Sequence, residues 1–184
     1  MVHGEFHAVP PESAVKPFCK NSKQYCDKNN IFISQASDGE LPQVQAAYFF
    51  NSIKFVTWPE APASPLVIRT FRSPAIAQAL ERAPEKSVHQ RFLDIMDVHR
   101  PQDLLGADAV FIPKEYAPVI PENIWKEFSV ATLVFSDWDK TLDRGGTIRL
   151  LTIGGKIRFA ISLRYATELT ISSKLLRLAS EIRE

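Results

Sequence analysis

The sequence has no uninterrupted apolar stretch of the roughly 18 to 20 residues that a membrane-spanning helix requires. It has no strong excess of charge either, since 22 Lys and Arg residues oppose 21 Asp and Glu residues and the formal net charge is +1. A basic nucleic-acid-binding protein is therefore not indicated. The opening residues, MVHGEFHAVPPES, lack the order of charged, apolar and small residues of a signal peptide, and we interpret them as a trimmed or tagged start. The 184 residues are 45% hydrophobic, which is enough for one core and one domain.

Cysteine is scarce. The chain has only Cys19 and Cys26, and both lie in the polar segment FCKNSKQYCDK. Cysteine is usually buried, so two cysteines in a hydrophilic segment are more typical of a disulfide or a metal site than of free thiols. His3 and His7 lie upstream and could complete a zinc site, although six intervening residues exceed the usual knuckle spacing. We favour a local disulfide, with free thiols and zinc as the alternatives.

The chain divides into two parts by composition. Residues 1–40 carry scattered Pro, Ser, Asn and Lys with no sustained period, and we expect an extended arm there. Residues 41–184 are expected to form one folded domain that begins with a helix over the run LPQVQAAYFFNSIKFVTWP (41–59). The pair Trp58–Pro59 is expected to end this helix, because the residue before a proline is forced out of the helical conformation.

Short apolar runs and helical runs alternate through the middle of the chain. Such alternation is typical of an α/β protein with a layered, mixed sheet flanked by helices. The expected strands are 66–71 (LVIRTF), 91–98 (RFLDIMDV), 107–113 (ADAVFIP) and 131–137 (ATLVFSD), and the expected helices are 73–83 (SPAIAQALERA) and 121–128 (PENIWKEF).

The run TIRLLTIGGKIRFAISL predicts a β-hairpin, because two segments of period 2 are joined by Gly154 and Gly155. The expected cross-strand pairs are Ile148 with Ile161, Leu150 with Phe159, and Thr152 with Ile157, which together form an apolar face. Arg149, Lys156 and Arg158 are expected on the opposite face.

A closing helix is predicted after the hairpin. Ser172 is its expected N-cap, and Arg177 and Glu181 are expected to form an i,i+4 ion pair. Its expected apolar stripe consists of Ile171, Leu175, Leu178 and Ile182. The predicted fold is thus a single α/β domain with a C-terminal hairpin and a closing helix.

The stretch VFSDWDKTLD has the D-x-D-x-T spacing of haloacid-dehalogenase-type phosphatases, with Asp137, Asp139 and Thr141 in the three positions. That chemistry also needs a later Lys, a later Ser or Thr, and an acidic pair that holds magnesium. The carboxylates downstream of Asp143 form no such pair. We therefore interpret the stretch as a polar loop between a strand and the hairpin, with a D-x-D-x-T phosphatase as a distant alternative.

Two segments of the chain carry a resemblance to a known family. They are AAYFFNSIKFVTWPE (46–60) and GGTIRLLTIGGKIRFAISLRYATELTISSKLLRLA (145–179). The first is similar to the opening helix, and the second to the closing signature, of the YfiR/HmsC-like family of periplasmic proteins. The residues that carry the resemblance, and that we expect to be structural, are Trp58, Pro59, Gly145, Gly146, Phe159, Ser172, Ser173, Leu175 and Leu176. Family members commonly carry core cysteines, whereas this chain has Ala107 and Asp108 at one such place, so any disulfide lies in the N-terminal arm.

The resemblance implies a non-catalytic regulator with no cofactor. The namesake of the family acts in the periplasm and represses a membrane-anchored diguanylate cyclase, which couples envelope or redox state to cyclic di-GMP and biofilm formation. Similar domains also serve as the extracytoplasmic sensors of other signalling proteins, so a small-molecule-sensing domain is the alternative function. The implied partner is an inner-membrane signalling protein, and a second copy of the chain is a further candidate.

Regulation of a membrane partner requires a protein-binding surface, and such surfaces favour arginine and aromatic residues. We expect Arg149, Arg158 and Arg164 to contribute to it. The first helix holds more aromatic residues than one side of a helix in a small core readily buries, so Tyr48 and Phe50 are added to the expected surface.

The disulfide hypothesis gives a testable prediction. Protein prepared from an oxidising compartment should show Cys19 and Cys26 protected from alkylation until a reductant is added, as measured by intact mass. Because the loop between them is short, the disulfide should stabilise the protein by less than about 3 kcal/mol. Two thiols that alkylate freely without reductant would exclude the disulfide.

Overall fold

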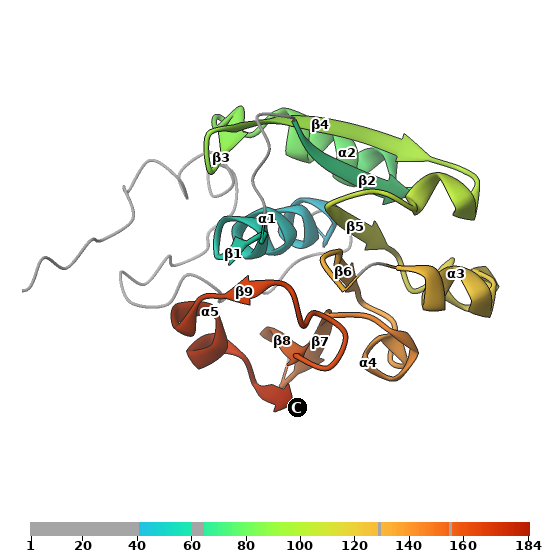
Figure 1. The fold of residues 1–184 in the computed structure, drawn as a ribbon, viewed down its shortest axis with the longest axis vertical. Helices are drawn as coiled ribbons and strands as arrows, with labels where there is room; N and C mark the ends of the chain where they lie inside the picture. The colour runs from blue at the N-terminus through green and yellow to red at the C-terminus, as the bar shows by residue number, and fades with distance from the viewer. Residues whose placement is uncertain (1–40, 60–64, 129, 155) are drawn as a thin grey trace, which may run out of the picture.

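The computed structural model of the protein describes residues 41–59, 65–128, 130–154 and 156–184. Figure 1 shows the helices and strands of these segments. In chain order they are α1 (Leu41–Lys54), β1 (Val56–Thr57), β2 (Leu66–Phe71), α2 (Pro74–Glu81), β3 (Ser87–Val88), β4 (Arg91–Val98), η2 (Pro101–Leu104), β5 (Ala109–Ile112), η3 (Ala117–Val119), α3 (Glu122–Glu127), β6 (Leu133–Ser136), α4 (Thr141–Arg144), β7 (Ile148–Ile153), β8 (Lys156–Ser162), β9 (Thr170–Ile171), α5 (Ser173–Leu178) and β10 (Glu181–Arg183).

The main sheet is mixed, as the sequence predicts. Its eight strands run in the order β10-β8-β7-β6-β5-β2-β4-β3. The strands β4, β2, β5, β6 and β7 pair in parallel, whereas β8 is antiparallel to β7 and β3 is antiparallel to β4. The strands β4 and β3 lie at one end of the sheet, and β8 and β10 lie at the other (Figure 1).

Each face of the sheet is covered by its own hydrophobic cluster. One cluster joins Phe111 and Phe135 of the sheet to buried residues of α1 and α2. The other joins Val110 and Val134 to residues of α3 and the 3-10 turns, including Trp125. Because successive residues of a strand point to opposite faces, these neighbours in sequence belong to different layers. The predicted α/β layered architecture is therefore confirmed.

The predicted strands and the hairpin register are confirmed. The strand β2 has the predicted bounds, and β4, β5 and β6 lie within the predicted runs. In the hairpin, Ile148 pairs with Ile161, Leu150 with Phe159, and Thr152 with Ile157. Gly154 has a φ of 57°, the left-handed conformation that a tight hairpin turn requires.

The predicted end of the first helix is wrong. The helix α1 ends at Lys54, four residues before Trp58, and Val56–Thr57 forms the strand β1. This strand pairs antiparallel with β9, with Val56 opposite Ile171. A two-residue strand exists only through its partner, which lies more than 100 residues later in the sequence, so a local pattern cannot reveal it.

The closing helix is also shorter than predicted. The helix α5 ends at Leu178, and the chain then forms β10, which runs parallel to β8. The expected Arg177–Glu181 pair is therefore absent, because Glu181 instead bonds Arg183. The expected N-cap is confirmed, since the Ser172 hydroxyl accepts a hydrogen bond from the Lys174 amide at 3.3 Å.

The expected arm and the two cysteines lie outside the described residues. None of the helices in the described segments combines the length and the apolar character that a membrane crossing needs.

The Gly145–Gly146 pair leads into β7 under tight steric limits. Gly145 has a φ of 114°, which side-chain-bearing residues avoid. A Cβ on Gly146 would lie 2.2 Å from Thr141 Cγ2 and 2.8 Å from the Thr141 carbonyl oxygen. The second of these contacts is with backbone, which cannot rotate away. The pair is therefore required for the chain to pass from α4 to β7.

Gly146→Ala should lower the free energy of unfolding by about 1 to 3 kcal/mol, because the new methyl group overpacks the contact with Thr141. Urea unfolding monitored by circular dichroism measures the change. Gly154→Asn is the matched control, since a Cβ added at Gly154 would contact no non-neighbouring heavy atom within 4 Å and asparagine tolerates the left-handed conformation. Equal stability of the Gly146→Ala variant and the wild type would contradict this account.

Candidate functional site

The D-x-D-x-T stretch follows β6 at the carboxyl end of the parallel strands. The Asp137 carboxylate accepts a hydrogen bond from Gln45 Nε2 of α1 at 3.0 Å and from the Lys114 amide at 2.7 Å. The Thr141 hydroxyl is fully buried and donates to the Trp138 carbonyl oxygen at 2.6 Å. Asp139 is exposed. The motif residues therefore tie α1 and the loop after β5 to the end of β6.

Burial raises the pKa of the Asp137 carboxyl above its usual value, and the hydrogen bond from the Lys114 amide opposes this shift. Desolvation disfavours the charged form of the carboxyl, so folding favours its protonation. Within the described residues, no group of three or more His, Cys, Asp or Glu side chains could hold a metal ion. The geometry favours the interpretation of this stretch as a structural loop.

The β7–β8 hairpin separates its apolar and basic side chains by face. Its apolar face belongs to the core, where Ile148 and Phe159 are buried. On the opposite face the register places Arg149 opposite Ala160 and Arg158 opposite Leu151, so the two arginines are diagonal neighbours. The predicted basic face is thus confirmed in its geometry.

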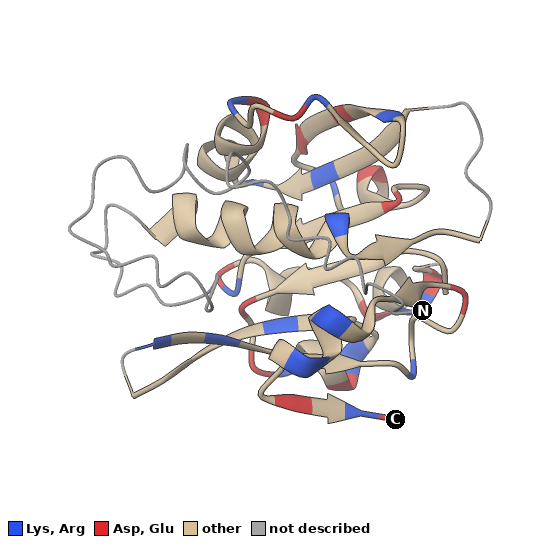
Figure 2. Cartoon of the chain, turned by 90° about the vertical axis from the view of Figure 1, so that its left-hand side faces the viewer, with Lys and Arg blue, Asp and Glu red and all other residues tan. Residues whose placement is uncertain are grey.

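The last quarter of the chain is basic. Blue segments gather around the C-terminus in the lower part of Figure 2. Residues 140–184 contain nine basic side chains, Lys140, Arg144, Arg149, Lys156, Arg158, Arg164, Lys174, Arg177 and Arg183, against four acidic ones, Asp143, Glu168, Glu181 and Glu184. Since the whole chain has a net charge of only +1, this end of the molecule is distinctly more positive than the rest.

The three arginines of the expected surface differ in their surroundings. Arg149 is half-buried and donates from Nη1 to the Asp139 carbonyl oxygen at 3.0 Å, which links the hairpin to the loop after β6. Arg158 is half-buried and lies nearer the hairpin turn. Arg164 is exposed in the segment after β8, where its Nη2 lies 3.5 Å from the Glu184 carbonyl oxygen. The structure brings Arg149 and Arg158 together and places Arg164 farther along the same chain segment.

The expected exposure of Tyr48 and Phe50 is wrong. Tyr48 is 3% exposed and Phe50 is 1% exposed. The Tyr48 hydroxyl donates to the Ile157 carbonyl oxygen at 3.0 Å, and burial raises the pKa of this hydroxyl well above its usual range. The helix α1 packs against the sheet and against α2, so several of its sides are buried and its aromatic residues fit within the core.

Sequence reasoning missed two apolar residues on the basic face. Ile153 is 53% exposed and pairs with Lys156, and the half-buried Leu151 pairs with Arg158. The period-2 alternation places both on the face that carries the arginines and would have revealed them. The hairpin therefore offers apolar and cationic side chains on one surface, hereafter the hairpin face (Arg149, Leu151, Ile153, Lys156 and Arg158).

The family-motif residues occupy structural positions for the most part. Trp58, Phe159 and Leu175 are buried in the core beside α1, Leu176 packs against that core, and Pro59 is exposed. Ser172 caps α5 and Ser173 begins it, while Gly145 and Gly146 form the tight passage into β7.

A comparison with protein families supports the resemblance that the two sequence segments suggested. The family described as YfiR/HmsC-like matches residues 42–180, which include both segments that suggested the resemblance. No curated protein sequence matches the chain.

Asp137→Asn should not remove any phosphatase activity, because the geometry commits the carboxylate to structural hydrogen bonds. Phosphate release from an aryl phosphate with magnesium measures this. Turnover above background that the substitution abolishes would contradict the structural interpretation.

The same variant tests the pKa of Asp137. A raised folded-state pKa means that the folded protein holds the proton more tightly, so the wild type should lose stability relative to Asp137→Asn as the pH rises from about 4 to 7. Urea unfolding at several pH values measures the difference. A difference that is constant with pH would show that burial does not perturb this carboxyl.

Proposed function

Because the chain belongs to the YfiR/HmsC-like family, we propose that it is a non-catalytic periplasmic regulator that binds and represses a membrane-anchored diguanylate cyclase. In this role it limits cyclic di-GMP and biofilm formation. The family match over residues 42–180 is the observation that carries the proposal. In the D-x-D-x-T stretch, Asp137 and Thr141 form hydrogen bonds within the fold, which is consistent with a binding function.

The hairpin face supports a protein-binding role. It combines two arginines with the exposed Ile153, and arginine with apolar residues is the composition that protein interfaces favour. The positive charge of residues 140–184 would accelerate association with an acidic partner surface. We propose that the cyclase presents acidic and apolar groups to this face.

Arg158 is the residue of choice for a test. It is half-buried on the hairpin face, and within the described segments it forms no ion pair with an acidic residue. Arg149 is less suitable, because its bond to the Asp139 carbonyl oxygen contributes to the fold.

Deletion of the gene should raise cyclic di-GMP and surface attachment, and Arg158→Glu should reproduce part of that rise while the protein stays folded. The reversed charge repels an acidic partner surface. Arg82→Glu is the charge-matched control, since Arg82 is exposed beside α2, far along the sheet order from the hairpin. Cyclic di-GMP is quantified by mass spectrometry, and folding is checked by thermal unfolding.

The deletion tests the repressor function, and the Arg158→Glu variant tests the hairpin face as the binding surface. Unchanged cyclic di-GMP after deletion would exclude the repressor function and leave small-molecule sensing as the alternative. A rise after deletion without a rise in Arg158→Glu would keep the function and exclude the hairpin face.

A further inference from the structure

The opposite end of the sheet has an edge strand with little cover. The strand β4 pairs with β2 along Leu93–Val98 on one side. On its other side β3 pairs only with Arg91 and Phe92, and the described residues contain no strand beyond it. Residues 94–98 of β4 therefore form an open edge within the described structure.

The backbone groups that face this open edge can be identified. The Val98 carbonyl accepts from the Arg72 amide after β2, so even-numbered residues of β4 direct their backbone groups toward β2. The Leu93 amide donates in the other direction, to the Lys86 carbonyl. By this alternation Ile95 and Asp97 direct their N–H and C=O groups outward, where a further strand would pair.

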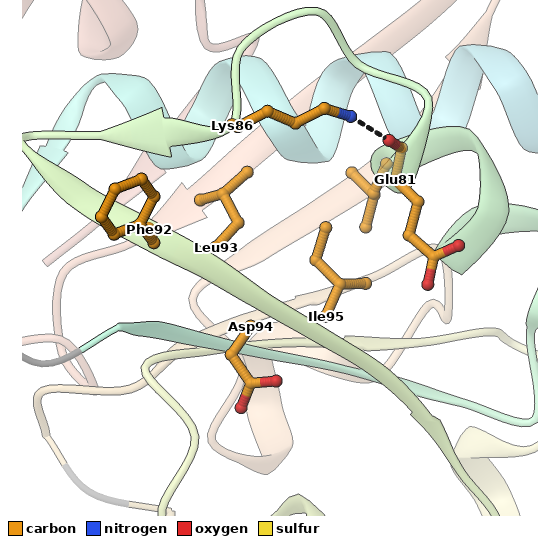
Figure 3. Close-up of a pocket in the computed structure, with 7 residues that line it drawn as sticks. Glu81, Lys86, Phe92, Leu93, Asp94 and Ile95 are labelled. Atoms are coloured by element: carbon orange, nitrogen blue, oxygen red, sulfur yellow. Dashed lines mark hydrogen bonds between the residues drawn. The ribbon is translucent and has the colours of Figure 1, made fainter.

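A groove of about 390 Å³ lies along this edge, between β4 and the end of α2 (Figure 3). Leu80, Leu93 and Ile95 give it an apolar lining, and Glu81 and Lys86 stand at its rim. The Lys86 amine is held by the Glu81 carbonyl oxygen, whereas the Glu81 carboxylate points away from that bond (Figure 3). The groove thus offers apolar surface beside a carboxylate.

The charges of β4 do not protect the edge against pairing. Charged side chains usually keep edge strands from pairing. Here Asp94 is bound by Arg69 at 2.8 Å, and Asp97 accepts from Thr70 at 2.6 Å and from the Ser73 amide at 2.7 Å, so both carboxylates are tied to β2 and the turn after it. On the outer surface of β4, Phe92 is 74% exposed and Met96 is 52% exposed.

We propose that the open edge of β4 binds an extended peptide segment of another protein, which adds to the sheet as a strand. Backbone pairing with Ile95 and Asp97 would supply affinity, and an apolar side chain in the groove with a Lys or Arg beside Glu81 would supply specificity. A second copy of this chain is a poorer occupant, because residues 92–98 of its own β4 contain no basic side chain that could pair with Glu81. This site lies at the far end of the sheet from the hairpin face and does not depend on the proposed repressor function.

The probe is a blocked peptide of sequence Lys-Val-Thr-Val-Thr-Val-Lys, added to the full ¹⁵N-labelled chain. Saturating peptide should slow amide exchange of Ile95 and Asp97 by at least about tenfold, and leave Asp94 and Met96, which already pair with β2, unchanged. Phe92→Ser should weaken binding about threefold or more, because Phe92 flanks the groove. Val119→Ser, at a residue that is 65% exposed elsewhere, is the matched control.

Two N-methylated peptides distinguish strand addition from apolar adhesion. Methylation of the three valine amides blocks one edge of the peptide, and methylation of the two threonine amides blocks the other. One of these peptides should bind within about threefold of the parent and the other at least about tenfold more weakly.

Three results would overturn the proposal. Equal binding of both methylated peptides would show that the edge forms no strand. Slow exchange of Ile95 and Asp97 in the free chain at low concentration would show that another part of the chain covers the edge. Protection that grows with protein concentration without peptide would assign the edge to a second copy.

Discussion

The packing of α1 on the middle of the sheet is the interaction on which the rest of the fold depends. Phe49 of α1 packs against Phe111 of β5 and Phe135 of β6, with ring centroids 5.7 Å and 5.2 Å apart, and all three are fully buried. The same helix forms two hydrogen bonds with other elements. Gln45 donates to the Asp137 carboxylate after β6, and the Tyr48 hydroxyl donates to the Ile157 carbonyl oxygen of β8. The helix therefore holds the end of β6 and the strand β8 in one arrangement, which positions the hairpin and its basic face.

Local patterns predicted the parts of the fold that local physics determines. The hairpin register follows from alternation and a Gly-Gly turn, and the buried strands β5 and β6 follow from short apolar runs between turn residues. The strands β1 and β10 could not be predicted, because each has only two or three residues and exists through pairing with β9 or β8. The true ends of α1 and α5 depend on those pairings, so both helices were predicted too long.

The candidate binding surface was also predictable from the sequence only where a local pattern determines it. The opposite faces of Arg149 and Phe159 follow from period 2 alone, and the structure has that arrangement. The burial of Tyr48 and Phe50 depends on contacts of α1 with several elements at once, which the sequence of the helix does not encode. The fold thus uses the aromatic residues of α1 for the core, and the two surfaces that we propose for partner binding lie at the two ends of the sheet. The hairpin face lies at one end and the β4 edge at the other.

Site-specific photo-crosslinking in cells tests the central claim most directly. A photoreactive amino acid replaces Arg158 in one strain and Arg82 in another, and the crosslinked proteins are identified by mass spectrometry. The account predicts that position 158 crosslinks to a membrane protein with a diguanylate cyclase domain and that position 82 does not. Crosslinking to such a protein from position 82 but not from position 158, or to none from either, would contradict it.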